Sequence, residues 1–236
     1  MIKGIYTAGR SLQQRTQNID IVSNNLANLS TVGYKREIPF SEMVNEFGET
    51  EIRKLTSMVQ GEIIHTNNPM DLAISGKGFF VVKNENGDLE LTRDGKFKIS
   101  DEGFLVDKNG RPVMGKGGEI SLQDSMLTNM DTITIDKNGE LKVDEKVYDK
   151  LLIVKVEDES SMKRSAGANF IPGSSGFIEV PENEYGISQG FLEQANTNPI
   201  IEMEEMIQVS KNYESAQKII AALDRSMEDA ISIGKI

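Results

Sequence analysis

Apolar residues recur every three or four positions at both ends of this 236-residue chain. Near the start, the repeating positions are Ile5, Ala8, Leu12, Ile19, Val22, Leu26 and Leu29. Near the other end, they are Met203, Met206, Ile207, Tyr213, Ile220, Leu223, Met227 and Ile231. This spacing predicts two amphipathic helices, each with an apolar stripe narrow enough for a coiled-coil seam. We expect the two helices to pair with each other.

The charges of the two ends favour this pairing. Residues 1–36 hold five basic side chains and one acid, whereas residues 200–236 hold seven acidic and four basic side chains. Opposite charges attract, although each exposed ion pair contributes only about 0.2–1 kcal/mol. Two ordinary amphipathic helices of a single domain would show the same periodicity, so that alternative stays open.

The middle of the chain has the pattern of β-structure, with short apolar segments separated by turn signals. The turns are Asn84-Glu85-Asn86-Gly87, Arg93-Asp94-Gly95, Asp101-Glu102-Gly103, Lys108-Asn109-Gly110 and Lys137-Asn138-Gly139. Asx-Gly pairs supply the positive φ that tight hairpins need. We therefore predict an antiparallel meander that forms a small sandwich or barrel-like domain, with its strongest strand at residues 151–156 and a later one at 177–180.

Together these patterns predict an α+β fold, in which N- and C-terminal heptad helices pair as a coiled coil around a central antiparallel β-rich domain. Residues 1–33 plus 199–236 form the expected terminal-helix domain. Residues 34–69 form an extended or partly helical connector, 70–190 a β-rich outer domain, and 191–198 a return linker. The first helix should end near Ser30. The second should begin at Asn198-Pro199 and run to about Ile233.

No catalytic or metal-binding motif in the sequence has all of its required residues. The chain has no cysteine and a single histidine, His65, without the Gly-x-Ser-x-Gly elbow of a hydrolase. The segment Gly110–Gly117 resembles a phosphate-binding loop, but Gly117 stands where Ser or Thr must hold magnesium. Asp136–Glu140 lacks the ligand spacing of a calcium loop. We predict no catalytic, cofactor-binding or metal-binding residues.

Charge and hydropathy exclude two further classes. The formal net charge of −11 argues against nucleic-acid binding, because phosphate contacts need a basic face. No stretch approaches the roughly 18 apolar residues of a membrane span. The first thirty residues also lack the unbroken apolar region of a cleaved signal peptide, so, if this protein leaves the cytoplasm, another route must carry it.

Four motifs occur along the chain in a fixed order. Residues 23–36 read SNNLANLSTVGYKR, and residues 70–80, 92–97 and 190–196 read MDLAISGKGFF, TRDGKF and GFLEQAN. In this combination they resemble the bacterial flagellar rod and hook family, in which the first motif ends the N-terminal helix. The stretch from Ile133 to Val156 looks more like the shorter F-type rod proteins than the G-type distal rod proteins, and both stay open.

The resemblance implies a structural subunit of the flagellar basal-body rod, part of its drive shaft and export channel. Such a subunit leaves the cytoplasm unfolded through the flagellar type III export apparatus, without a cleaved signal. It then assembles helically, outside the cytoplasmic membrane, with itself and other rod proteins. The assembly interface would comprise the apolar positions of both helices together with Asn24, Asn25, Asn28, Gly33 and Tyr34. The asparagines would either end the helix or bond between subunits.

A second interpretation comes from a different class of protein. A permanent coiled-coil stalk could present the β domain to a ligand or cell-wall partner, as in a soluble binding module. The order of residues 1–33 and 199–236 in the dilute monomer separates the two interpretations, because isolated helices are marginal without tertiary support.

Overall fold

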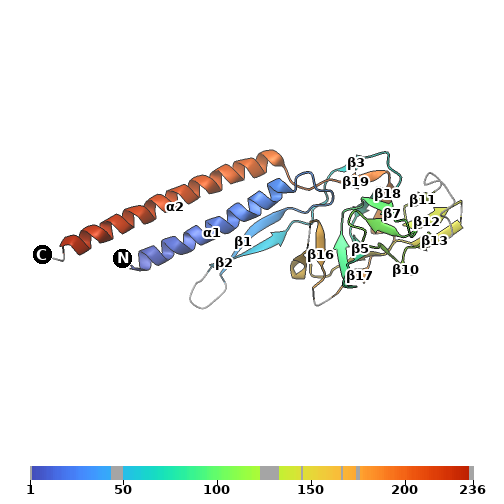
Figure 1. Cartoon of the computed structure of the whole chain (residues 1–236), viewed down its shortest axis with the longest axis horizontal. Coiled ribbons are helices and arrows are strands. Elements are labelled where there is room, and N and C mark those ends of the chain that lie inside the picture. The colour runs from blue at the N-terminus through green and yellow to red at the C-terminus, as the bar shows by residue number, and fades with distance from the viewer. Residues whose placement is uncertain are drawn as a thin grey trace. The chain divides into compact units, whose positions relative to one another are not determined.

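The computed structural model describes residues 2–43, 50–122, 133–144, 146–165, 167–173 and 176–233. A helix lies at each end of the chain and the part between them is rich in antiparallel strands, which confirms the α+β class (Figure 1). The chain divides into two compact units. The first unit comprises Met1–Leu29, Arg36–Ser57 and Thr197–Ile236, and the second comprises Ser30–Lys35 and Met58–Asn196.

The first unit contains both helices and one β-hairpin. Its elements are α1 (Ile2–Ala27), β1 (Glu37–Met43), β2 (Thr50–Thr56) and α2 (Pro199–Ile233). Helix α2 has the bounds that the sequence predicted, because Asn198 caps it with a side-chain oxygen 2.9 Å from the amide nitrogen of Ile200. Helix α1 contacts α2, β1 and β2. It ends within three residues of the predicted position at Ser30.

The hairpin departs from one expectation for residues 34–69. Strands β1 and β2 pair antiparallel over seven residues each, so the partly helical alternative is wrong for the described part of this segment. Pro39 lies within β1 and carries no N–H, which an edge strand tolerates. Glu37 faces α1, where its backbone nitrogen bonds to the side chain of Asn25 at 2.9 Å.

Within the described residues, the second unit contains the remaining strands and the short 3-10 turn η3 (Glu159–Ser161). The first strands are β3 (Ile63–His65), β4 (Leu72–Gly76), β5 (Phe79–Lys83), β6 (Leu89–Thr92), β7 (Phe97–Ile99), β8 (Leu105–Asp107), β9 (Met114–Gly115) and β10 (Gly118–Glu119). The later strands are β11 (Ile133–Ile135), β12 (Glu140–Val143), β13 (Lys146–Lys150), β14 (Ile153–Lys155), β15 (Lys163–Arg164), β16 (Asn169–Ile171), β17 (Ile178–Glu179), β18 (Tyr185–Gln189) and β19 (Phe191–Glu193).

The sheet topology is antiparallel but is not the predicted meander. The largest sheet has six strands in the order β15-β16-β6-β5-β14-β17, so neighbours in space are often distant in sequence. Smaller sheets pair β4 with β18 and β3 with β19, which brings the end of the unit back to its beginning. Only local hairpins such as β5–β6 and β11–β12 follow chain order. Long-range pairing of this kind leaves no trace in local turn signals.

Strand β5 lies at the centre of the packing. Its side chains alternate between two apolar clusters, with Phe80 and Val82 in one and Phe79 and Val81 in the other. All four are at most 4% exposed. The sequence analysis did not anticipate that both faces of this strand are covered, which explains why the run is continuously apolar rather than alternating.

Four of the five predicted turns have the expected backbone. Gly87, Gly103, Gly110 and Gly139 all have positive φ, between 82° and 88°. The fifth turn, at Arg93-Asp94-Gly95, differs. A Cβ on Gly95 would lie 1.7 Å from the backbone oxygen of Leu72, so glycine is required there by close approach of the chain rather than by a hairpin turn.

Candidate assembly site

The exposure of α2 repeats every seven residues. The less exposed positions include Glu202, Met206, Val209, Tyr213, Ala216, Ile220, Leu223 and Met227. Successive steps of three and four keep these residues on one side of a helix. Glu202 and Ala216 are buried, at 0% and 8% exposure. Five of the predicted α2 positions, Met206, Tyr213, Ile220, Leu223 and Met227, therefore lie on this side.

Two predicted α2 positions lie elsewhere. Met203 and Ile207 are 50% and 56% exposed, so they lie outside the less exposed row of this chain, and their role in an assembly interface stays a prediction. Each residue of a helix turns by about 100°, so Met203 lies about 100° and Ile207 about 140° around the helix from Glu202. The sequence pattern therefore merged two apolar stripes on different faces into one. The side chain of Ile231 is outside the described residues.

Helix α1 buries its most apolar positions in its second half. Val22 is 2% exposed, and Leu12, Ile19, Leu26 and Leu29 are partly buried. Ile21, which the heptad did not include, is fully buried at 0%. A helix that contacts both another helix and a hairpin needs a wider apolar face than a two-helix seam, which explains the additional residue. The side chain of Ile5 is outside the described residues.

The three asparagines near the end of α1 have different environments. Asn24 is exposed, and its backbone oxygen accepts from the side chain of Asn28 at 2.8 Å, so Asn28 caps the helix end. Asn25 is fully buried and exchanges two hydrogen bonds with the backbone of Glu37, at 2.8 and 2.9 Å. It also donates to the carboxylate of Glu202 at 3.1 Å. Asn25 thus links α1, β1 and α2.

An ion-pair cluster surrounds the side-chain amide of Asn25. Arg36 bonds through Nε to Glu202 and through one terminal nitrogen to both oxygens of Glu205, each at 2.9 Å. Burial lowers the pKa of Arg36, but the hydrogen bonds and charges of Glu202 and Glu205 outweigh it, so that pKa is raised above its usual value. The sequence analysis did not single out Arg36 or Glu202. The sequence offers one signal for Glu202, since acidic residues in the first turns of α2 suit the positive end of the helix dipole.

Gly33 and Tyr34 lie inside the second unit rather than on a surface. Gly33 has φ of +67°, and a Cβ there would lie 2.3 Å from the backbone carbon of Arg93. Tyr34 is 1% exposed, and the guanidinium of Arg164 lies 4.4 Å from its ring centroid. Both residues stabilise the fold of this chain, so the expectation that they present a surface to neighbouring subunits is not supported by their burial.

A buried charge cluster forms around Lys35, the residue that follows Tyr34. The Nζ of Lys35 lies 2.5 Å from one oxygen of Glu193, and a guanidinium nitrogen of Arg93 lies 3.1 Å from the other. The amide of Gly61 also donates to Glu193, at 2.9 Å. Burial lowers the pKa of Lys35 more than the adjacent Glu193 raises it. Two cations therefore share one carboxylate, and all three side chains are at most 6% exposed.

The cluster explains why the four motifs occur together. Lys35 belongs to the first motif, Arg93 to the third and Glu193 to the fourth. The guanidinium of Arg93 also donates to the backbone oxygens of Ile74 and Gly76 in the second, at 3.3 and 2.8 Å. Sequence reasoning recognised these stretches without predicting that their charged residues meet, because no local pattern connects positions 158 residues apart.

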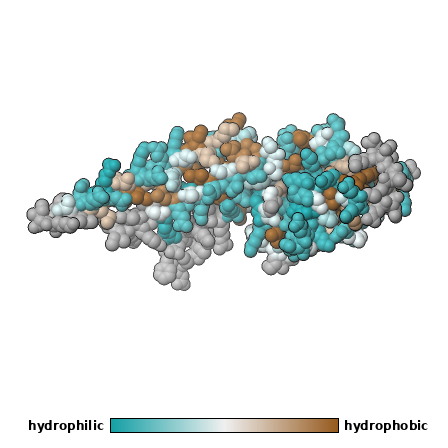
Figure 2. Space-filling model, viewed as in Figure 1, coloured by the Kyte–Doolittle hydropathy of each residue, from teal (hydrophilic) through white to brown (hydrophobic). Residues whose placement is uncertain are grey.

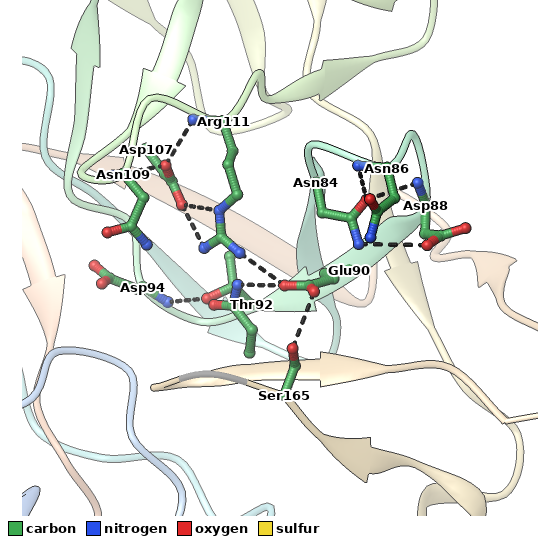
Figure 3. A network of polar contacts seen from close by, with 11 residues as sticks. Asn84, Asn86, Asp88, Glu90, Thr92, Asp94, Asp107, Asn109, Arg111 and Ser165 are labelled. Atoms are coloured by element: carbon green, nitrogen blue, oxygen red, sulfur yellow. Dashed lines mark hydrogen bonds and ion pairs between the residues drawn. The ribbon is translucent and has the colours of Figure 1, made fainter.

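A second polar network lies in the same unit (Figure 3). Arg111 bonds to Asp107 at 2.6 and 2.8 Å and to Glu90 at 2.8 Å, and Glu90 also accepts from Ser165 and Asn169. Its carboxylates are thus engaged by protein donors, and the network serves to connect β6, β8 and β16. Within the described ranges, no three His, Cys, Asp or Glu side chains are placed to hold a metal ion.

His65 has a packing role. It is exposed, pairs across β3 and β19 with Phe191, and lies 4.8 Å from that ring between centroids. Of the helices in the described part of the chain, neither is long and apolar enough to cross a membrane.

Comparisons with known proteins agree with these assignments. Three family models match in order: the flagella basal body rod protein model at residues 5–35, the flagellar hook protein FlgE/F/G D1 domain at 73–143, and the flagellar basal body rod FlgEFG protein C-terminal model at 188–233.

Similar proteins match over nearly their whole length. The flagellar basal-body rod protein FlgF of Caulobacter vibrioides is 31% identical, with 93% of each chain covered. FlgF of Mesorhizobium japonicum is 25% identical over 98% of this chain and 97% of its own. FlgG of Buchnera aphidicola from Acyrthosiphon pisum is 27% identical, covering 97% and 98%. This chain belongs to the flagellar basal-body rod protein family, with FlgF-like proteins ahead of FlgG-like ones among its relatives.

Proposed function

We propose that this chain is a structural subunit of the flagellar basal-body rod, which polymerises helically through its terminal helices. One observation carries the proposal: the chain aligns with rod proteins over nearly its whole length, and the matched segments include most of α1 and all of α2. The resulting polymer contributes to the drive shaft and to the export channel within it. Its neighbours are copies of itself and other rod proteins.

The terminal helices pair as a coiled coil in this proposal. The seven-residue repeat of less exposed positions on α2 supports this, because a period of 3.5 keeps one row of side chains against a partner. The partner row on α1 comprises Leu12, Ile19, Val22 and Leu26. Glu202 and Asn25 occupy one end of the seam, where their hydrogen bond fixes the register.

In this proposal the terminal helices and the β-rich region have different roles. Residues 1–33 and 199–236 act in assembly, and the β-rich region over 70–190 forms the outer part of the subunit. The chain reaches the rod through the flagellar type III export apparatus, without a cleaved signal, and resides outside the cytoplasmic membrane.

A gene deletion tests the proposal. Cells that lack this chain should build truncated rods and lose motility, as seen by electron cryotomography of their basal bodies. The wild-type gene should restore both, and a version that ends at Asn198 and so lacks α2 should restore neither. A full-length version with Glu119→Gln, a surface change in the second unit, serves as the matched control. Intact rods in the deletion strain would contradict the proposal.

Limited proteolysis separates the rod subunit from a binding module with a permanent stalk. For a rod subunit, the dilute chain should lose both ends and retain a protected core of about residues 70–190, because helices are marginal until neighbours cover them. Protection of both termini in the monomer would instead favour the stalk.

A further inference from the structure

The backbone passes between the two units at both ends of the short segment Ser30–Lys35, before Met58 and after Asn196. We call Ser30–Lys35 the entry segment and residues 191–196 the exit segment, because they begin and end the second unit. A load that travels along the chain from either terminal helix therefore reaches the second unit at one of these two segments.

The entry and exit segments are bonded directly to each other. The backbone nitrogen of Gly33 donates to the backbone oxygen of Glu193 at 2.8 Å, and that of Asn196 donates to the backbone oxygen of Tyr34 at 3.2 Å. The Nζ of Lys35 also lies 2.5 Å from the carboxylate of Glu193. The two backbone bonds advance along both segments in the same sense, so the segments run in the same direction where they meet.

This shared direction decides how the bonds are loaded. Tension between the ends of the chain pulls the entry segment back towards α1 and the exit segment forward towards α2. Segments that run the same way and are pulled from opposite ends slide past each other, so all of their bonds are loaded at once. By contrast, an antiparallel pair that is pulled apart at one end opens one bond at a time. The contact of the entry and exit segments therefore has the geometry that best resists tension.

A further crossing of the chain is tied to the same place. The backbone oxygen of Val59 accepts from the Nζ of Lys35 at 2.9 Å and from the side-chain nitrogen of Asn196 at 2.7 Å. Val59 is the second residue after the backbone re-enters the second unit at Met58. One carbonyl thus joins the entry segment, this crossing and the exit segment.

The contact is also anchored in the interior of the second unit. Tyr34 and Glu193 are 1% and 0% exposed. Glu193 ends β19, which pairs with β3, and its carboxylate accepts from Arg93 and from the amide of Gly61. The entry and exit segments therefore cannot separate without exposing the buried charges of this cluster.

The proposed assembly explains why load would reach these segments. Ile200 and Met203 in the first turns of α2 are 74% and 50% exposed, and hydrophobic side chains gather there in the space-filling view (Figure 2). Exposed apolar side chains that lie together mark surfaces that bind other molecules. In the proposed rod, neighbouring subunits hold α2, which begins three residues after the exit segment ends.

We propose that the entry and exit segments form a mechanical clamp, which keeps the second unit folded while load passes between it and the terminal helices. This inference rests on the proposed function, in which those helices are fixed in a drive shaft. A buried ion pair is weak evidence for stability at equilibrium, because its attraction must first offset the desolvation of two charges. Under tension, the relevant quantity is instead the cost of pulling the pair apart, which is large.

Force spectroscopy tests the clamp on the full-length chain. A cysteine is added at each end of the chain, which has none of its own, and the protein is held between DNA handles in optical tweezers. The helices extend first, after which tension reaches Ser30 and Asn196. Forced unfolding is governed by the unfolding rate, and a bond that is broken in the transition state contributes fully to that rate. We expect Glu193→Gln to unfold the second unit at least about tenfold faster at a given force.

A second pulling geometry provides the matched control. Lys77→Cys and Asn183→Cys place the handles on two exposed residues that flank one end of the β4–β18 pair. Tension there peels an antiparallel pair before it reaches the clamp, so the wild-type chain should unfold at a lower force than between its ends. Glu193→Gln should accelerate this unfolding by less than about threefold, because the clamp is still closed in the transition state. Glu119→Gln should change the rate in neither geometry.

Equal acceleration by Glu193→Gln in the two geometries would overturn the inference, because Glu193 would then stabilise the unit in general rather than under load. If this variant does not fold, the wild-type chain decides alone: an unfolding force between its ends that is no higher than between positions 77 and 183 would also overturn the clamp. Both results would leave the proposed function untouched, since the gene deletion tests that separately.

Discussion

Glu193→Gln should strongly destabilise the second unit. The side chains of Lys35 and Glu193 are each 1% exposed and that of Arg93 is 6% exposed, so the substitution leaves two buried cations without a counter-charge. Removing one partner of a buried ion pair costs about 3–5 kcal/mol. Lys35 can relieve part of this cost by losing its proton, because burial already lowers its pKa, whereas Arg93 stays charged. We therefore expect the lower half of that range.

The effect is large relative to the stability of a domain, which is typically about 5–15 kcal/mol. With a urea dependence of about 2 kcal/mol per molar, the unfolding midpoint should fall by about 1.5–2 M. The assay is a urea titration in which hydrogen exchange is measured on a peptide that spans β5 and β6, so that it reports the second unit alone.

Glu119→Gln provides the matched control. Glu119 pairs with Lys83 at 2.9 Å, but the two side chains are 33% and 39% exposed. Such a pair contributes about 0–1 kcal/mol, so the midpoint should barely move. Equal midpoints for Glu193→Gln and Glu119→Gln would refute the role of the buried cluster.

Three further substitutions test other parts of the account. Gly33→Ala should lower the stability of the second unit by more than about 1 kcal/mol in the same titration, because φ is +67° and an added Cβ would collide with the backbone of Arg93. An unchanged urea midpoint would contradict this prediction. Glu90→Gln should flatten the acid dependence of thermal stability. Burial raises the pKa of Glu90, but hydrogen bonds from Asn169 and Ser165 and the charge of Arg111 outweigh it, so the pKa is lowered in the folded protein. The stabilisation is therefore present above about pH 4.5 and is lost as the pH falls through the pKa of folded Glu90. Parallel pH profiles would count against this. Leu26→Asp should block incorporation into rods while the β-rich unit stays folded, and normal incorporation would contradict the helix seam.

The parts of the fold that depend on neighbouring residues could be predicted from the sequence. The limits of α2 follow from Asn198, Pro199 and a long amphipathic period, and the structure has the same limits. The positive φ at Gly87 follows from the Asn-Glu-Asn-Gly signal, and that at Gly139 follows from the Asn-Gly signal. Each of these features is decided within a few residues, where propensity and turn chemistry act.

The remaining features depend on residues far apart in the chain. The sheet order, the pairing of β4 with β18 and the meeting of Lys35 with Glu193 all require long-range contacts that local patterns do not encode. The β1–β2 hairpin was missed for a related reason, because its apolar and charged residues alternate irregularly around Pro39. The heptad pattern also grouped Met203 and Ile207 with the less exposed positions of α2, since it does not distinguish an occupied stripe from an open one.

The most direct test of the central claim is electron cryomicroscopy of basal bodies isolated from cells that produce this chain. We predict density in the rod that fits the β-rich second unit, continuous with helices assignable to residues 2–27 and 199–233. Rod density that is fully accounted for by other proteins, with this chain absent from the particles by mass spectrometry, would contradict the account.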